Sequence, residues 1–144
     1  SGGQRQRLAI ARALVLDPAF IVADEPVSML DVSIRGEILK LLMRLVRERG
    51  LSLLFITHDL ALARHFCDRV AVMYLGQIVE YTDSGRLVQA PHHPYTQALM
   101  RAVVATDPGK KQIYTGLKGE IPNPANPPSG CRLHPRCPLA TEQC

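Results

Sequence analysis

The sequence lacks a run of apolar residues long enough to cross a membrane. None of its apolar stretches approaches the roughly 18 consecutive residues that a spanning helix needs. It also lacks a charged segment followed by an apolar stretch at its start, which a secretory signal requires. We therefore expect no helical membrane span and a cytoplasmic location.

The sequence also lacks a cluster of positively charged residues, and it has only four cysteines. The 17 Lys and Arg residues outnumber the 13 Asp and Glu residues, but they are scattered along the chain. A nucleic-acid-binding face needs concentrated positive charge, so we expect no nucleic acid partner. What the chain does have is apolar material, since 47% of its 144 residues are hydrophobic, which is enough for the core of one folded domain.

The spacing of the apolar residues predicts an α/β fold. Short apolar runs typical of strands buried on both faces of a parallel sheet alternate with runs that repeat on one helical face. The predicted strands lie at residues 20–23 and within 51–59, the hairpin strands at 69–74 and 77–81, and the helices at 4–16, 33–49, 60–66, 85–89 and 95–104. The 33–49 helix is then a right-handed crossover, and the hairpin adds an antiparallel edge to the sheet. The proline-rich remainder is expected to be irregular.

Carboxylates and a histidine follow the two predicted parallel strands. Asp24 and Glu25 come directly after the first strand, and His58 follows the second. Strands joined by a parallel crossover end at the same edge of a sheet, where α/β proteins place their ligands. Taken singly, these residues also fit a solvated strand end and a structural histidine.

The chain opens on Ser1, Gly2, Gly3 and Gln4, which lead into the first predicted helix. A serine N-cap, glycines that allow close backbone approach and free N–H groups at the positive end of a helix suit an anion such as phosphate. An ordinary capped helix after a flexible turn has the same features. The order of the motifs along the chain decides between these interpretations.

That order resembles the second half of an ATP-binding-cassette ATPase. The matching segments are SGGQRQRLAIARAL (1–14), similar to the signature motif without its usual preceding leucine, FIVADEP (20–26), similar to Walker B, SMLD (28–31), similar to the D-loop, and THD (57–59), similar to the switch histidine. The resemblance covers residues 1 to about 82. It implies the C-terminal half of a P-loop NTPase of the RecA-like type, with ATP and Mg²⁺ as ligands.

The family resemblance implies a role for each matching side chain. Asp24 would hold Mg²⁺ through water, and Glu25 would orient or deprotonate the water that attacks the γ-phosphate. His58 would hydrogen-bond the γ-phosphate, and Asp31 would tie the site to its neighbour. Ser1, Gly2, Gly3 and Gln4 would face the ATP that is held by a second ATPase subunit.

Beyond this region, the segments APHHPYTQALMRAV and GEIPNPANPPSGCRLHPRCP resemble the C-terminal extension of dipeptide and oligopeptide importer ATPases, a group that includes nickel importers. The resemblance implies an ATPase subunit at the cytoplasmic face of the membrane. Its partners would be a second ATPase subunit, transmembrane permease subunits and a periplasmic or extracellular solute-binding protein.

The family's phosphate loop, G-x-x-x-x-G-K-[ST], has no counterpart in the sequence, and neither do its upstream aromatic and glutamine loops. We therefore expect a C-terminal fragment that is inactive alone, with residues 1–82 from the ATPase domain and 83–144 from the extension. Met29 stands where the family usually has a small residue, which is a minor departure.

Three of the four cysteines, Cys131, Cys137 and Cys144, fall in the tail. In a cytosolic chain such clustering favours metal or cluster ligation over disulfides, and thiolates suit iron or zinc. The resemblance favours a four-iron–four-sulfur cluster, with a fourth ligand beyond Cys144 or replaced. Zinc with His134 as fourth ligand and unligated thiols in a partner-contacting loop are the alternatives.

Two other classes of protein compete with the importer ATPase. A non-transport cassette ATPase in DNA repair or translation lacks the His-Pro-Tyr segment and the cysteine-bearing tail, and a stand-alone metal-binding module would not bind ATP in its full-length form. The segment HHPYTQ (92–97) is predicted to cap a helix that starts at Pro94, in preference to binding a metal. Cys67 is expected to be a small buried apolar residue.

Overall fold

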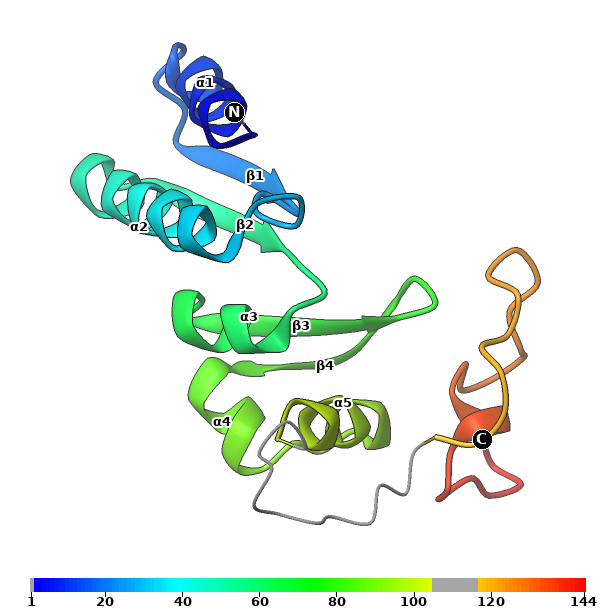
Figure 1. The fold of residues 1–144 in the computed structure, drawn as a ribbon. Helices are drawn as coiled ribbons and strands as arrows, with labels where there is room; N and C mark the ends of the chain where they lie inside the picture. Colours follow the sequence, from blue (N-terminus) through cyan, green and yellow to red (C-terminus); the bar gives the residue numbers. More distant parts are fainter. Residues whose placement is uncertain (1, 105–116) are drawn as a thin grey trace. The chain divides into compact units, whose positions relative to one another are not determined.

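The computed structural model describes residues 2–104 and 117–144 (Figure 1). These residues divide between positions 59 and 60 into two compact units. The first unit holds α1 (Gly2–Leu14), β1 (Phe20–Asp24), α2 (Val32–Arg49) and β2 (Ser52–Ile56). The second holds α3 (Leu60–Phe66), β3 (Arg69–Tyr74), β4 (Gln77–Asp83), α4 (Ser84–Gln89), α5 (Pro94–Val104) and the 3₁₀ helix η1 (His134–Arg136). Across residues 2–104 and 117–144, no helix combines the length and apolar character that a membrane span needs.

The first unit contains the predicted parallel crossover. β1 and β2 pair in parallel, from Phe20 opposite Ser52 to Asp24 opposite Ile56. α2 connects them and ends at Gly50, whose φ of 64° is the left-handed conformation that glycine adopts without strain. The strands, the crossover helix and its stop are therefore confirmed, and both strands end at one edge.

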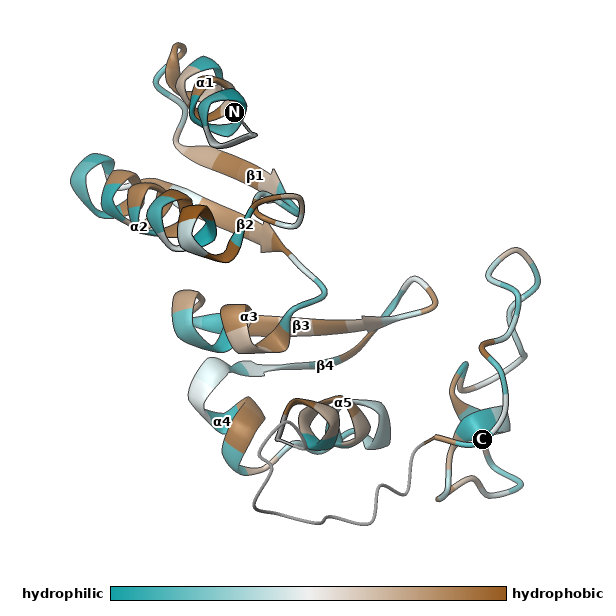
Figure 2. Ribbon diagram, viewed as in Figure 1, coloured by the Kyte–Doolittle hydropathy of each residue, from teal (hydrophilic) through white to brown (hydrophobic). Residues whose placement is uncertain are grey.

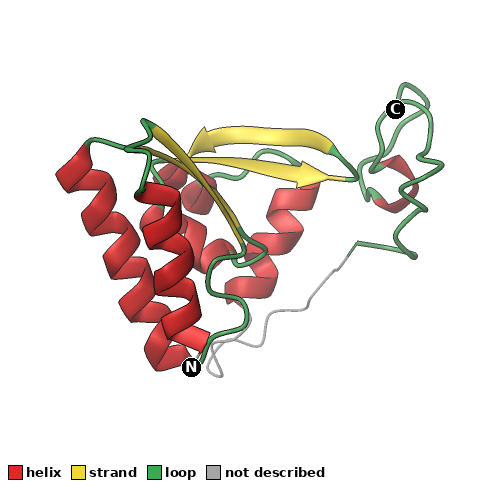
Figure 3. Ribbon diagram, turned by 90° about the horizontal axis from the view of Figure 1, so that it is seen from above, coloured by secondary structure: helices red, strands yellow, loops and turns green. Residues whose placement is uncertain are grey.

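α1 begins two residues earlier than predicted. It starts at Gly2, where position 4 was expected, and ends at Leu14, ahead of the expected residue 16. The backbone turns at Asp17, whose φ is 46°, before Pro18. α1 and α2 lie side by side (Figures 1 and 3).

The prediction that both strands are buried on both faces is wrong. Ala23 on the inner side of β1 is buried, but an outer apolar face remains exposed, formed by Phe20, Val22, Leu54 and Ile56. Figure 2 shows both strands in the brown of apolar residues. Sequence alternation cannot reveal one-sided burial when both faces are apolar, and among the described residues of the first unit no helix covers this outer face.

The second unit is built around the predicted hairpin. β3 and β4 pair antiparallel through a two-residue turn in which Leu75 and Gly76 both have positive φ, as a type I′ turn requires. The core between the hairpin and its helices consists of Ala63, Val70, Val72, Leu87 and Met100. Cys67 packs against this core as an apolar residue, but it is only partly buried where full burial was expected. Burial, with a smaller effect from Asp68, raises the pKa of its thiol.

The parallel pair and the hairpin are both present, but they are separate two-stranded sheets. Among the described residues, no ladder of hydrogen bonds makes the hairpin an edge of the parallel sheet. Each hairpin strand pairs with the other, so the backbone ladder of the hairpin joins neighbouring parts of the chain.

The tail from residue 117 onward is irregular apart from η1 and is attached to the hairpin turn. Arg132 Nη1 donates a hydrogen bond to the carbonyl oxygen of Leu75, and Arg136 Nη1 donates one of 3.4 Å to the hydroxyl of Tyr74. Leu133, between these arginines, is buried. Two guanidinium groups and one apolar side chain therefore hold this part of the tail in place.

The start of α5 confirms the predicted capping role of the HHPYTQ segment. α5 begins on Pro94, and Nδ1 of His93 accepts a hydrogen bond of 3.2 Å from the N–H of Tyr95. Burial lowers the pKa of His93, with a partial opposing effect from Glu80, so Nδ1 is available as an acceptor near neutral pH.

Glu80 binds the same segment from β4, a role that the sequence analysis missed. Its two carboxylate oxygens accept hydrogen bonds of 2.9 Å from the N–H groups of His92 and His93. Burial raises the pKa of Glu80, but these N–H groups, the nearby Thr96 hydroxyl and His92 outweigh it and hold the pKa below its ordinary value of 4.5. The Thr96 hydroxyl is buried, and among the described residues no group lies within hydrogen-bond distance and angle of it.

We expect Glu80→Gln to lower the free energy of unfolding by about 1 kcal/mol, because one of two charge-assisted hydrogen bonds is lost. The depressed pKa means that the carboxylate's contribution is fully present above pH 4.5 and is lost as the pH falls through the lower folded-state pKa. Urea unfolding at several pH values measures both effects. The exposed Glu120→Gln is the control, and equal stabilities of the two variants would contradict the assigned role.

Candidate functional site

Glu25 and His58 meet where β1 and β2 end. Oε1 of Glu25 lies 2.6 Å from Nδ1 of His58 and accepts a hydrogen bond of 3.1 Å from the backbone N–H of His58. An ionised carboxylate only accepts hydrogen bonds, so Nδ1 carries the proton and Nε2 remains for another partner. The Glu25 side chain is 35% exposed and that of His58 79%, so a ligand can reach both.

The backbone of Glu25 is in the left-handed region, with a φ of 46°. Residues other than glycine hold such a φ only when their surroundings fix it. The N–H of Glu25 donates a hydrogen bond of 3.0 Å to the carbonyl of Ile56, which extends the parallel ladder by one residue. Ser28 donates both its N–H and its hydroxyl to the carbonyl of Glu25, at 3.3 and 3.0 Å.

The loop between Glu25 and α2 is held by a side chain that the sequence analysis did not single out. Arg35 Nε donates a hydrogen bond of 2.7 Å to the carbonyl of Leu30, and its Nη2 donates one of 3.3 Å to the carbonyl of Ser28. Only its position in the first turn of the helix after the SMLD segment could have suggested this role.

The other predicted ligand-binding residues surround this loop. Asp24, the last residue of β1, is exposed, and Asp31 is the N-cap residue of α2, although its side chain makes no capping hydrogen bond. Gly2 and Gly3 pack closely on the loop and α2: a Cβ atom added to them would lie 3.0 Å from Leu30 and 2.7 Å from Ile34.

The opening motif also includes Ser1 and Gln4. Gln4 is exposed on α1, and Ser1 lies outside the described residues. A pocket of about 220 Å³ beneath α1 includes Asp24 but neither Glu25 nor His58, so the open edge of the sheet, and not this pocket, is the candidate site.

The tail cysteines are brought near one another by the backbone. The N–H of Cys131 donates a hydrogen bond of 2.8 Å to the carbonyl of Cys144, and His134 donates from its N–H to the carbonyl of Cys131 and accepts through its own carbonyl from Cys137. All three thiols are free. In the part of the chain that the structure describes, however, no three His, Cys, Asp or Glu side chains are arranged to hold a metal ion, so the residues present do not fit a cluster as they stand.

Comparison with protein families yields two matches. Residues 79–144 match the oligopeptide/dipeptide transporter C-terminal region, and residues 1–28 match the ABC transporter family. The second match contains Asp24 and Glu25, and the first begins within β4.

Relatives match over the whole chain. The "Probable peptide ABC transporter ATP-binding protein y4tS" of Sinorhizobium fredii is 57% identical over 144 residues, which are all of this chain and 41% of that protein. The "Oligopeptide transport ATP-binding protein OppF" of Escherichia coli is 54% identical over 146 residues, covering all of this chain and 44% of the relative. The chain thus spans less than half the length of these curated relatives.

Among solved structures, the dimeric post-hydrolysis state of the ATP-binding cassette MJ0796 bound to ADP and Pi is 39% identical, with a TM-score of 0.52 over 58% of this chain and 36% of that chain. With the parallel pair that brings Glu25 to His58, this defines the class as an ATP-binding cassette of α/β fold. Over its whole length the chain is similar to ATP-binding proteins of peptide ABC transporters, and its residues 79–144 match the C-terminal region of the oligopeptide and dipeptide type.

Proposed function

We propose that this chain contributes the water-activating and signature segments of an ATPase that drives the import of peptides or nickel. The observation that carries the proposal is the contact of 2.6 Å between Glu25 Oε1 and His58 Nδ1 at the ends of neighbouring parallel strands. Whole-chain identity to proteins named as peptide ABC transporter ATP-binding proteins supports the transported class.

Glu25 is the residue that we assign to the attacking water. Its carboxylate is held from one side by His58 and is partly exposed on the other, so it can orient a water and accept its proton. Only the imidazolium form of His58 has N–H groups on both nitrogens and can donate to Glu25 and a phosphate oxygen at once. That form would hold the Glu25 carboxylate and the phosphate at a fixed distance from each other.

The chemistry of Asp24 fits Mg²⁺, which prefers oxygen ligands and keeps part of its hydration shell. Its carboxylate is exposed at the end of β1, next to Glu25 in the chain. Mg²⁺ arriving with ATP neutralises phosphate charge. Asp24 would hold it through water.

The signature segment would act on a second subunit. Gly2 and Gly3 start α1, and with Ser1 and Gln4 they would close on an ATP held by the partner ATPase, while Asp31 would contact that partner. The MJ0796 cassette that this chain resembles is described as dimeric, which supports a paired arrangement. Permease subunits and a solute-binding protein would complete the importer, with the ATPases on the cytoplasmic face of the membrane.

Phosphate release from Mg-ATP tests the proposal. The protein to use has the length of the relatives, carries this sequence and supplies a phosphate loop. Hydrolysis that increases with the permease and peptide present is the expected result. An absence of hydrolysis under those conditions would contradict the ATPase assignment.

A four-iron–four-sulfur cluster on Cys131, Cys137 and Cys144 remains a proposal for the complete protein. The hydrogen bond between the backbones of Cys131 and Cys144 supports closeness of these ligands, although their side chains must rearrange and a fourth ligand must come from elsewhere. We expect anaerobically purified full-length protein to contain iron and sulfide and to absorb visible light. Protein with zinc would favour the His134 alternative, and metal-free protein would favour unligated thiols.

A further inference from the structure

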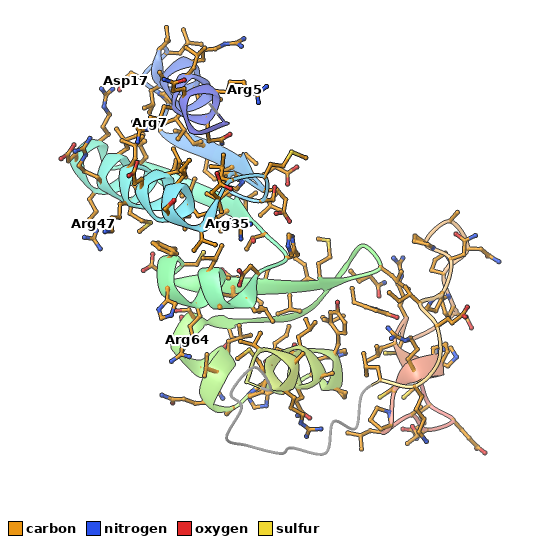
Figure 4. All side chains as sticks on the ribbon, in the orientation of Figure 1. Arg5, Arg7, Asp17, Arg35, Arg47 and Arg64 are labelled. Atoms are coloured by element: carbon orange, nitrogen blue, oxygen red, sulfur yellow. The ribbon has the colours of Figure 1, made fainter. Side chains whose placement is uncertain are left out.

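A series of hydrogen bonds runs from the first turn of α2 to Glu25. The guanidinium of Arg35 binds the carbonyls of Leu30 and Ser28 at 2.7 and 3.3 Å, and Ser28 in turn donates twice to the carbonyl of Glu25. Figure 4 labels Arg35 at the start of α2, beside the loop that precedes this helix. One side chain therefore links the helix to a loop of which one end is Glu25.

The helix that carries Arg35 is anchored by buried side chains. α2 is anchored in the first unit by the buried residues Ile38, Leu39 and Leu42, and the Arg35 side chain is itself partly buried. A guanidinium presents its N–H donors in a planar fork, so it can bind two carbonyls of one loop at a fixed separation. An ammonium group on a flexible stem lacks that fixed geometry.

What the link holds is a strained turn. Glu25 has a φ of 46°, and the two bonds from Ser28 fix its carbonyl. Relaxing φ would rotate the peptide and turn the side chain away from its present direction, because φ sets the orientation of the Cα–Cβ bond relative to the strand. The contact between the Glu25 carboxylate and His58 depends on that direction.

We propose that Arg35 is a positioning residue for ATP hydrolysis. By fixing the carbonyls of Ser28 and Leu30, it keeps Glu25 in the left-handed turn that aims its carboxylate at His58 and the attacking water. This inference rests on the proposed function, since a carboxylate with no water to activate needs no such alignment. Arg35 acts through the loop, by its hydrogen bonds to the carbonyls of Leu30 and Ser28.

The test uses the full-length ATPase that carries this sequence, with the variants Arg35→Ala, Arg35→Lys and Ser28→Ala. We expect Arg35→Ala to lower kcat for ATP about 10-fold with KM unchanged within about twofold, because misalignment of the base affects the chemical step and not ATP binding. Arg35→Lys should fall between Ala and the parent. Arg44→Ala is the control, since Arg44 is an exposed α2 residue that pairs only loosely with Glu48, at 3.9 Å.

The double variant Ser28→Ala/Arg35→Ala measures whether the two residues act as one unit. We expect it to lose little more than Arg35→Ala alone, and independent, multiplying losses would overturn the proposed series. Thermal unfolding separates positioning from folding: a loss of kcat that follows the melting temperature across the variants, Arg35→Lys included, would also overturn it.

Failure of this inference and failure of the proposed function give different results. If the parent hydrolyses ATP, Glu25→Gln does not, and Arg35→Ala behaves like Arg44→Ala, then only the role of Arg35 is wrong. If the parent itself releases no phosphate from Mg-ATP, the proposed function fails and the role of Arg35 fails with it.

Discussion

In a full-length protein that carries this sequence, Glu25→Gln should abolish ATP turnover, lowering kcat at least about 100-fold, while ATP-driven pairing of the subunits persists. The amide keeps the size of the carboxylate and an oxygen that can accept the backbone N–H of His58, now 3.1 Å from Oε1. It cannot take a proton from water. Phosphate release measures the loss of turnover, and size-exclusion chromatography with and without Mg-ATP measures the pairing.

The matched control for that experiment is Glu37→Gln on α2. Glu37 is exposed and its carboxylate pairs with Arg7, so its amide should leave turnover unchanged. Parent-like hydrolysis by Glu25→Gln would show that another group activates the water. Loss of both subunit pairing and ATP turnover would instead show that Glu25 is needed for the subunits to associate.

Gly3→Ala and Gly36→Ala should change stability in opposite directions, although both add one methyl group to a helix. At Gly3 the new Cβ would lie 2.7 Å from Cγ2 of Ile34, and at Gly36 it would meet nothing within 4 Å. Cγ2 is attached to the β-branched carbon of Ile34, whose χ1 has one strongly preferred rotamer in a helix, so the clash cannot be relieved at the end of a flexible side chain.

We expect Gly36→Ala to raise the free energy of unfolding by about 0.5–1 kcal/mol, since alanine restricts the unfolded chain and favours helix. Gly3→Ala should lower it by about 1–2 kcal/mol, because overpacking outweighs the gain in helix propensity. Urea unfolding of the 144-residue chain checks both values. A stabilising Gly3→Ala would mean that α1 can move away from Ile34.

The parts of the fold that follow from local patterns were predictable. α2 repeats apolar residues on one face and meets Gly50 at its end, and α3 was predicted at its observed bounds. The meeting of Glu25 and His58 follows from topology, because parallel strands joined by one crossover end at the same edge. Their contact distance and the Glu25 φ do not follow from any pattern.

The interactions that could not be predicted from the sequence depend on the conformations of loops. Arg35 reaches carbonyls whose positions depend on the conformation of residues 25–31, and Glu80 meets His92 only when β4 and the start of α5 lie together. The uncovered outer face of β1 and β2 was missed for another reason. An apolar run indicates which residues avoid water and does not show whether a covering segment is present.

The left-handed backbone of Glu25 places stability and turnover in opposition at one position. A side chain in this region costs about 1–2 kcal/mol relative to glycine, which adopts the same φ freely. Selection for a more stable cassette alone would therefore favour glycine at position 25 and remove the carboxylate. Thermostable variants obtained without an activity screen should be sequenced at this turn first, because a glycine there would raise the melting temperature and remove the carboxylate that we propose activates water.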